Sequence, residues 1–140
     1  MSQPKKRGPK RNPASRIRPP ESVRASSTQE YVSFSFRHIV EHEDYCLHRC
    51  EVKLRAGILD HLHKLSKLKW ADILQAAASG LGAEKIDQQQ LHTKVPAHIT
   101  QEVPIYVVHT FQKVPVAGYK EDAVFHLVWI DRHFKLYDHG

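Results

Sequence analysis

The amino-acid sequence begins with a segment that cannot form a hydrophobic core, and this limits the fold to the rest of the chain. Residues 1–29 contain five of the eight prolines and almost no large apolar side chain. Such a segment buries too little apolar surface to offset the entropy lost on folding, so we expect it to be disordered. A single folded domain is therefore predicted over residues 30–140, a length that supports one modest core.

Charge divides the chain at the same place. Residues 1–29 carry eight basic residues and one acidic residue, whereas residues 30–140 carry thirteen basic and fourteen acidic residues and all eleven histidines. Extended, uncompensated positive charge is typical of segments that bind nucleic-acid phosphates. The alternative is a solvated tail that only aids solubility. The predicted phosphate-binding residues are Lys5, Lys6, Arg7, Lys10, Arg11, Arg16 and Arg18.

One basic run, KKRGPKR at residues 5–11, resembles both an AT-hook and a nuclear-localisation run. An AT-hook lays a Gly-Arg-Pro core along the minor groove of DNA, whereas the order here is Arg-Gly-Pro-Lys. The run therefore leaves RNA and DNA both open as partners of the tail.

Composition also excludes several classes of protein. No stretch approaches the roughly 18 apolar residues that a membrane span needs, and no apolar signal-peptide region follows the basic start. The two cysteines, Cys46 and Cys50, are too few for a disulfide framework. We expect a soluble cytoplasmic protein that does not associate with membranes.

Hydrophobic periodicity predicts one strand and two helices in the first half of the domain. Aromatic and β-branched residues at near-alternate positions of residues 31–40 favour a strand. Apolar residues in 54–65 recur at steps of four, four and three, which places them on one face of a helix. A second helix is predicted over residues 67–78, with Gly80 as its C-terminal stop.

The last part of the chain is predicted to form an antiparallel sheet. Strands are expected at residues 103–111, 124–130 and 134–137, with a turn at Gly118 and a tight turn at 131–133. No element is predicted for residues 83–100. An N-terminal strand, two helices and a C-terminal antiparallel sheet define an α+β fold. The predicted core residues are Leu62, Trp70, Ile73, Phe125 and Trp129.

The end of the chain resembles a group of small, poorly characterised bacterial proteins. Residues 118–140, GYKEDAVFHLVWIDRHFKLYDHG, match the pattern G-[YF]-[KR]…FH-[LIV]-[LIV]-W-[ILF]-D…H…LY of that group. By layout only, the helix pair followed by a sheet resembles RelE/YoeB-type toxins, which are small ribonucleases of toxin–antitoxin pairs. That resemblance implies RNA as the substrate and an antitoxin as a protein partner. The chain departs from the toxin pattern in its nearly neutral body and its basic tail.

Residues of the types that can cleave RNA without a metal ion are concentrated near the C-terminus. Such cleavage needs a base for the 2′-hydroxyl, an acid for the leaving oxygen and a cation for the phosphorane, and histidine, tyrosine and arginine fill these roles. If residues 124–130 alternate regularly, Phe125, Leu127 and Trp129 share one face, and His126 on the other face is expected to meet His109 across the sheet. The candidate catalytic residues are His109, His126, Arg132, His133, Tyr137 and His139.

Zinc binding is the alternative use of some of these residue types. The stretch HEDYCLHRC contains His42, Cys46, His48 and Cys50, which are soft ligands of the kind that zinc prefers. Their spacing is not that of a standard zinc site, so free thiols are favoured and neither metal nor cofactor is predicted. Two functions remain open: a RelE-like, metal-independent endoribonuclease or a degenerate relative of one, and a non-enzymatic binding module of a nucleoprotein complex.

Overall fold

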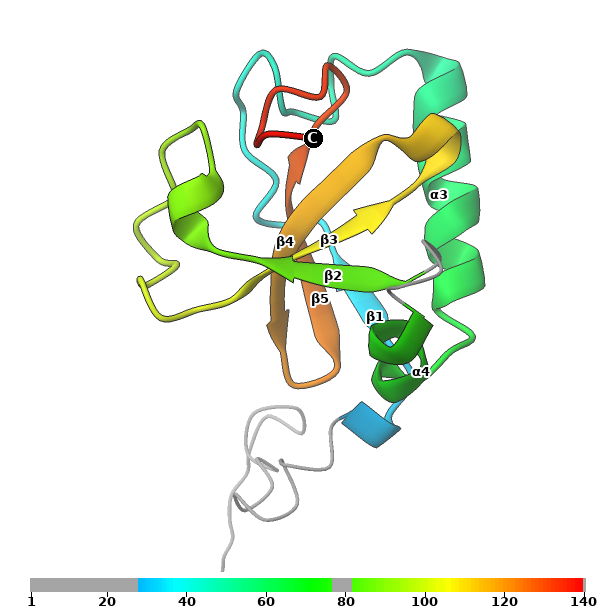
Figure 1. Ribbon diagram of the computed structural model, residues 1–140. Helices are drawn as coiled ribbons and strands as arrows, with labels where there is room; N and C mark the ends of the chain where they lie inside the picture. Colours follow the sequence, from blue (N-terminus) through cyan, green and yellow to red (C-terminus); the bar gives the residue numbers. More distant parts are fainter. Residues whose placement is uncertain (1–27, 77–81, 140) are drawn as a thin grey trace, which may run out of the picture.

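Figure 1 shows a computed structural model of the protein, which describes residues 28–76 and 82–139. The elements in chain order are β1 (Ser33–Ser35), α3 (Val52–Leu65), α4 (Trp70–Gln75), β2 (Ala83–Ile86), the short 3-10 helix η3 (Gln88–Gln90), β3 (Ile105–His109), the short 3-10 helix η4 (Phe111–Lys113), β4 (Pro115–Glu121) and β5 (Val124–Ile130). The predicted phosphate-binding residues of the tail lie outside the described residues, as do Ala77, Ala78 and Gly80.

The strands of the described residues form one five-stranded sheet with the order β1-β5-β4-β3-β2. The pairs β2–β3, β3–β4 and β4–β5 are antiparallel, whereas β1 lies at the edge of the sheet and is parallel to β5. The predicted α+β class is confirmed. The predicted strand at 31–40 is wrong in length, because only Ser33–Ser35 pair with β5 before the chain turns at residues 37–38.

Both helices lie on one side of the sheet (Figure 1). Ile58, Leu62 and Leu65 of α3 are buried in the core between helix and sheet, as the spacing predicts. The second helix begins at Trp70 rather than at residue 67. Residues 66–68 form a turn instead, and Lys69 makes a β-bridge to Tyr31. No helix in the described ranges is long and apolar enough to cross a membrane.

The other face of the sheet is covered by irregular chain rather than by helices. Its core contains Ile105, Val107 and Trp129 of the sheet together with Leu136 and Tyr137 of the C-terminal segment. The predicted core is confirmed in full, because each of its five members is almost completely buried: Leu62, Trp70, Ile73, Phe125 and Trp129.

Strand β4 contradicts the predicted turn at Gly118. Gly118 lies inside the strand, where a Cβ atom would collide with the backbone carbonyl of His126 on β5. The glycine therefore permits a close backbone approach. The turn of this hairpin lies further along, at Asp122 and Ala123, where Asp122 has a φ of 53°.

A β-bulge changes which side chains of β5 face the helices. Ala117 pairs with Trp129 and Gly118 pairs with Leu127, so Val128 is an extra residue on β5. As a result, Val128 and Trp129 both belong to the core on the helix-free face, while Leu127 belongs to the core under the helices. The expectation that Leu127 and Trp129 share one face is wrong for this reason.

The predicted final strand at residues 134–137 is absent. The turn at Arg132 and His133 forms as expected, but the backbone N–H groups of Lys135 and Leu136 donate to the Asp131 carboxylate instead of to a neighbouring strand. The segment therefore folds around a buried side chain. Strand β2, for which the sequence predicted no element, pairs with β3 and forms the opposite edge of the sheet from β1.

Candidate active site

Three of the six candidate catalytic residues lie around one pocket of about 320 Å³. His109 is the last residue of β3, and Glu84 projects from β2 on the same, helix-free face of the sheet. Tyr137 and His139 come from the C-terminal segment that covers this face. The pocket is completed by Ile86, Gln90 and Asp138.

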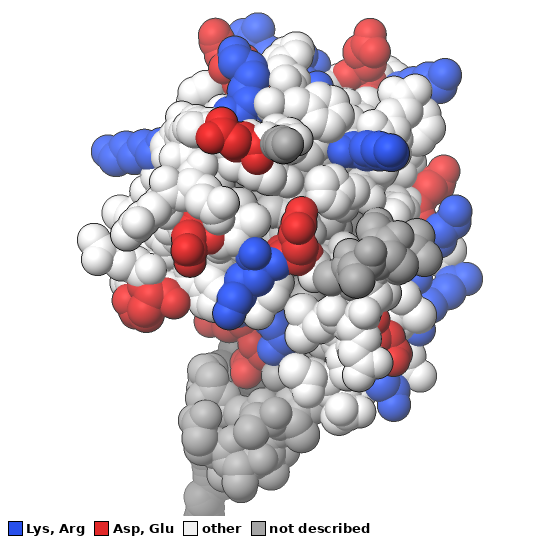
Figure 2. Space-filling model, in the orientation of Figure 1, with Lys and Arg blue, Asp and Glu red and all other residues white. Residues whose placement is uncertain are grey.

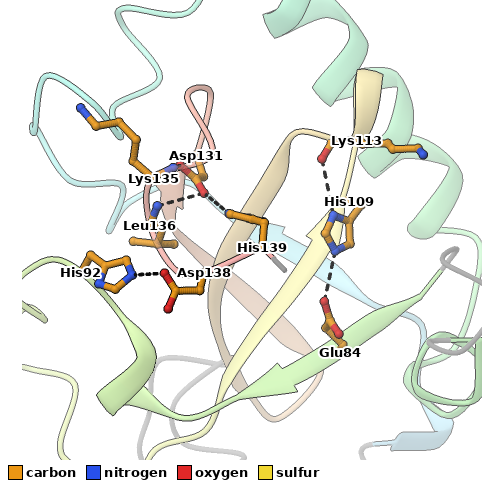
Figure 3. A network of polar contacts seen from close by, with 9 residues as sticks. All are labelled: Glu84, His92, His109, Lys113, Asp131, Lys135, Leu136, Asp138 and His139. Atoms are coloured by element: carbon orange, nitrogen blue, oxygen red, sulfur yellow. Dashed lines mark hydrogen bonds and ion pairs between the residues drawn. The ribbon is translucent and has the colours of Figure 1, made fainter.

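Asp131 holds His139 in a defined orientation (Figure 3). The Asp131 carboxylate is fully buried and accepts the backbone N–H groups of Lys135 at 2.8 Å and Leu136 at 3.1 Å. These bonds compensate for the loss of water around the charge. The same carboxylate lies 3.1 Å from Nε2 of His139. Because an ionised carboxylate only accepts, His139 donates from Nε2, which leaves the lone pair of a neutral ring on Nδ1.

His109 has acceptors at both ring nitrogens. Its Nε2 lies 3.2 Å from a carboxylate oxygen of Glu84, and its Nδ1 lies 3.4 Å from the carbonyl oxygen of Lys113 (Figure 3). Both bonds form together only when both nitrogens carry a proton, because neither partner can donate. His109 and His139 therefore have different hydrogen-bonding environments: both ring nitrogens of His109 face acceptors, whereas only Nε2 of His139 has a partner among the described residues.

Tyr137 lines the pocket, and its ring lies against that of His139. The centroids of the two rings are 4.1 Å apart, and the Tyr137 hydroxyl has no hydrogen-bond partner among the described residues. Burial, reinforced by the carboxylates of Glu84 and Asp131, raises the pKa of Tyr137 to about 12. The hydroxyl therefore stays protonated and can act as a neutral hydrogen-bond donor.

The pocket has little positive charge of its own. Neither lysine nor arginine is among its lining residues, and Glu84 and Asp138 contribute carboxylates, the second of which bonds to His92 at 3.0 Å. On the face shown in Figure 2, lysine and arginine side chains alternate with aspartate and glutamate and form no continuous basic surface. The pocket therefore offers an anion no lysine or arginine to pair with.

His126 is not part of this pocket, and the expected contact between His126 and His109 is wrong. Strand β4 lies between the strands that carry the two histidines, so they cannot pair directly. His126 instead stacks on Tyr119 of β4, with ring centroids 4.8 Å apart, and bonds to Glu121 at 3.1 Å. The ring of His38 belongs to the same group, with its centroid 5.5 Å from that of His126.

Arg132 and His133 line a different pocket, of about 380 Å³. Its other lining residues are Glu51, Leu54, Gln112, Val114 and Phe134. Arg132 donates from Nη2 to the carbonyl oxygen of Glu43 at 2.9 Å, so it fixes the loop before α3. The reversal of the chain at the turn separates both residues from the pocket that contains His139.

The two carboxylates that bond to the histidines of the pocket, Asp131 and Glu84, were not expected from the sequence. Asp131 follows the buried end of β5 and is a position of the C-terminal pattern, so that pattern could have indicated it. Glu84 has no such signal, because it is an ordinary polar residue of a short strand that periodicity does not detect.

The stretch around Cys46 and Cys50 does not assemble a metal site. Among residues 28–76 and 82–139, no three histidine, cysteine, aspartate or glutamate side chains are arranged to hold a metal ion. Both thiols are free and buried; Cys50 donates weakly to the carbonyl oxygen of Cys46 at 3.6 Å. Burial raises the pKa of the Cys50 thiol, which keeps it protonated.

Comparison with known proteins found no matching family model, no matching curated protein and no matching solved structure.

Proposed function

We propose that the protein is a metal-independent endoribonuclease in which His139 is the general base and His109 is the general acid. One observation carries this proposal: two histidines with complementary hydrogen-bond partners line the same pocket. A base needs a free lone pair and an acid needs a proton to give, and the surroundings of the two rings meet these needs separately.

In the proposed reaction, Nδ1 of His139 takes the proton of a ribose 2′-hydroxyl, and the 2′-oxygen attacks the adjacent phosphorus. The new bond forms as the bond to the 5′-oxygen breaks, and His109 gives its proton to that leaving oxygen. The products are a 2′,3′-cyclic phosphate and a 5′-hydroxyl. The neutral hydroxyl of Tyr137 would donate to a non-bridging oxygen while charge builds up there.

The basic tail completes this proposal. Because the pocket contains no lysine or arginine, the attraction of a polyanion to the chain would come from the tail residues between Lys5 and Arg18. A cytoplasmic RNA substrate and an antitoxin-like protein partner belong to the proposal through the resemblance in layout to RelE/YoeB-type toxins. A resemblance of this kind supports a substrate class and not an activity.

A second candidate function is a non-enzymatic binding module of a nucleoprotein complex. The carboxylates of Glu84 and Asp138 in the pocket wall favour it, since they repel phosphate. In that case Asp131 and His139 would only close the C-terminal segment over the sheet.

The two functions are separated by incubating the purified full-length chain with a fluorescent RNA oligonucleotide in the presence of a chelator. The ribonuclease predicts fragments that end in a 2′,3′-cyclic phosphate, and a loss of about 100-fold or more in rate for His139→Gln and for His109→Gln. His133→Gln, an exposed histidine outside the pocket, is the matched control. Intact RNA, or cleavage that persists equally in all variants, would leave the binding module as the better account.

A further inference from the structure

Besides the two pockets described above, a pocket of about 390 Å³ lies between the chain that follows β1 and the first turn of α3. It is the second candidate binding site and is called the second pocket below. Its volume is within the range of small-molecule sites. Arg37, His48 and Arg55 line it together with a single carboxylate, Glu41. The pocket therefore has an excess of positive charge, unlike the pocket that contains His139.

The two arginines of this second pocket have no ion-pair partner in the part of the chain that the structure describes. Within residues 28–76 and 82–139, no carboxylate lies at ion-pair distance from the guanidinium of Arg37 or of Arg55. Nε of Arg55 is in addition buried and has no hydrogen-bond partner there. Buried donors are nearly always paired in folded proteins, so this one indicates a missing acceptor.

The remaining walls of the second pocket are apolar. Ile39, Val40 and Leu47 are partly buried, and the ring of Phe36 is 38% exposed beside them. Two guanidinium groups in one pocket match the charge of a phosphate dianion better than that of a single carboxylate. An exposed aromatic ring next to an apolar wall suits the flat face of a nucleobase.

We propose that this second pocket binds a nucleoside monophosphate, with the phosphate on Arg37 and Arg55 and the base against Phe36. The same chemistry occurs in a free nucleotide and at the 5′-phosphorylated end of an RNA chain. The proposal does not depend on the ribonuclease activity, because none of its residues lines the pocket of His109 and His139.

Binding is measured by isothermal titration of the full-length chain with adenosine 5′-monophosphate, and with adenosine as the ligand that lacks the phosphate. We expect the nucleotide to bind and adenosine to bind at least about tenfold more weakly. Arg55→Gln and Arg37→Gln should each weaken nucleotide binding by about tenfold or more. Arg37 is exposed, so its replacement tests the site even if Arg55→Gln does not fold.

Arg49→Gln is the matched control, since Arg49 is exposed, lies near the second pocket in sequence and does not line it. It should leave the affinity unchanged, whereas Glu41→Gln should strengthen binding by removing repulsion. A second titration compares an oligoribonucleotide with and without a 5′-phosphate, and a preference for the phosphorylated end assigns the site to RNA ends rather than to free nucleotides. Absence of nucleotide binding, or equal weakening by Arg37→Gln and Arg49→Gln, would overturn the proposal.

Discussion

At the scale of single residues, Asp131 connects the fold to the candidate active site. One carboxylate accepts two backbone N–H groups and a histidine side chain while it is completely buried. The same atoms therefore shape the C-terminal segment and select the tautomer of His139. Glu84 differs, because its side chain is about half exposed and hydrogen-bonds to His109 alone among the described residues.

Replacing Asp131 by asparagine should affect both stability and activity. An amide keeps one acceptor, but its NH₂ group meets N–H donors, so the free energy of unfolding should fall by about 2 kcal/mol. RNA cleavage should fall by about 100-fold or more, because His139 is no longer held as the base. Urea denaturation and a cleavage assay measure the two effects. Asp138→Asn, at a side chain that is 95% exposed, should change stability by less than about 0.5 kcal/mol.

Tyr137→Phe should behave in the opposite way for stability. It removes a buried hydroxyl that has no partner, so the free energy of unfolding should stay constant or rise by about 1 kcal/mol. If the hydroxyl donates to the phosphate, the catalytic rate should nevertheless fall. A variant that is both less stable and fully active would contradict both parts of this expectation.

The pH dependence of Tyr137 follows from the direction of its pKa shift. The pKa rises from 10.0 to about 12 on folding, so the unfolded chain loses this proton first as pH increases. The contribution of the protonated Tyr137 to the free energy of unfolding is therefore complete below pH 10.0 and is lost between pH 10.0 and about 12. Urea denaturation at pH 9 and pH 11 should show a smaller loss in Tyr137→Phe than in the unchanged protein.

At the scale of elements, the bulge in the β4–β5 hairpin determines how the sheet is covered. The extra residue on β5 sends Trp129 to the face without helices, where it packs with Leu136 and Tyr137. The C-terminal segment thus has an apolar surface to cover, and covering it brings His139 next to β3. Gly118 makes this geometry possible, because β5 approaches its backbone closely.

Gly118→Ala should therefore destabilise the whole domain rather than a local turn. The added methyl group collides with the carbonyl of His126, and backbone atoms cannot rotate away as a side chain can. We expect a loss of about 2–3 kcal/mol in the free energy of unfolding, measured by urea denaturation. Asp122→Gly, at the turn where the positive φ suits glycine, is the contrasting change and should cost much less than Gly118→Ala. Equal midpoints for Gly118→Ala and the unchanged protein would contradict this account.

At the scale of the whole molecule, a nearly neutral domain follows a strongly basic segment. If the segment attracts RNA, a chain that begins at residue 28 should lose most of its affinity and most of its dependence on salt. This truncation keeps Glu30, whose carbonyl accepts the N–H of Trp70 at the start of α4, so the domain should still fold. Binding is measured by fluorescence anisotropy at 50 and 200 mM salt. Equal affinity and equal salt dependence of the two chains would show that the tail is not the electrostatic contact.

Local pattern was enough to predict a large part of the fold. The spacing of the apolar residues in α3 and the apolar run of β5 required burial on their own, because each is an amphipathic or fully buried element whatever it packs against. His109, Tyr137 and His139 could be named as candidates from residue type alone. Their division in space from His126, Arg132 and His133 could not be predicted from residue type.

That division depends on contacts between distant parts of the chain. An extra residue in β5 and the insertion of β4 between β3 and β5 are set by backbone pairing, which leaves no periodic trace in the sequence. Likewise, residues 134–137 have the alternation of a strand, but the buried carboxylate of Asp131 takes their N–H groups first. The sequence by itself determined which residues can carry the chemistry, and only the tertiary structure decided which of them meet.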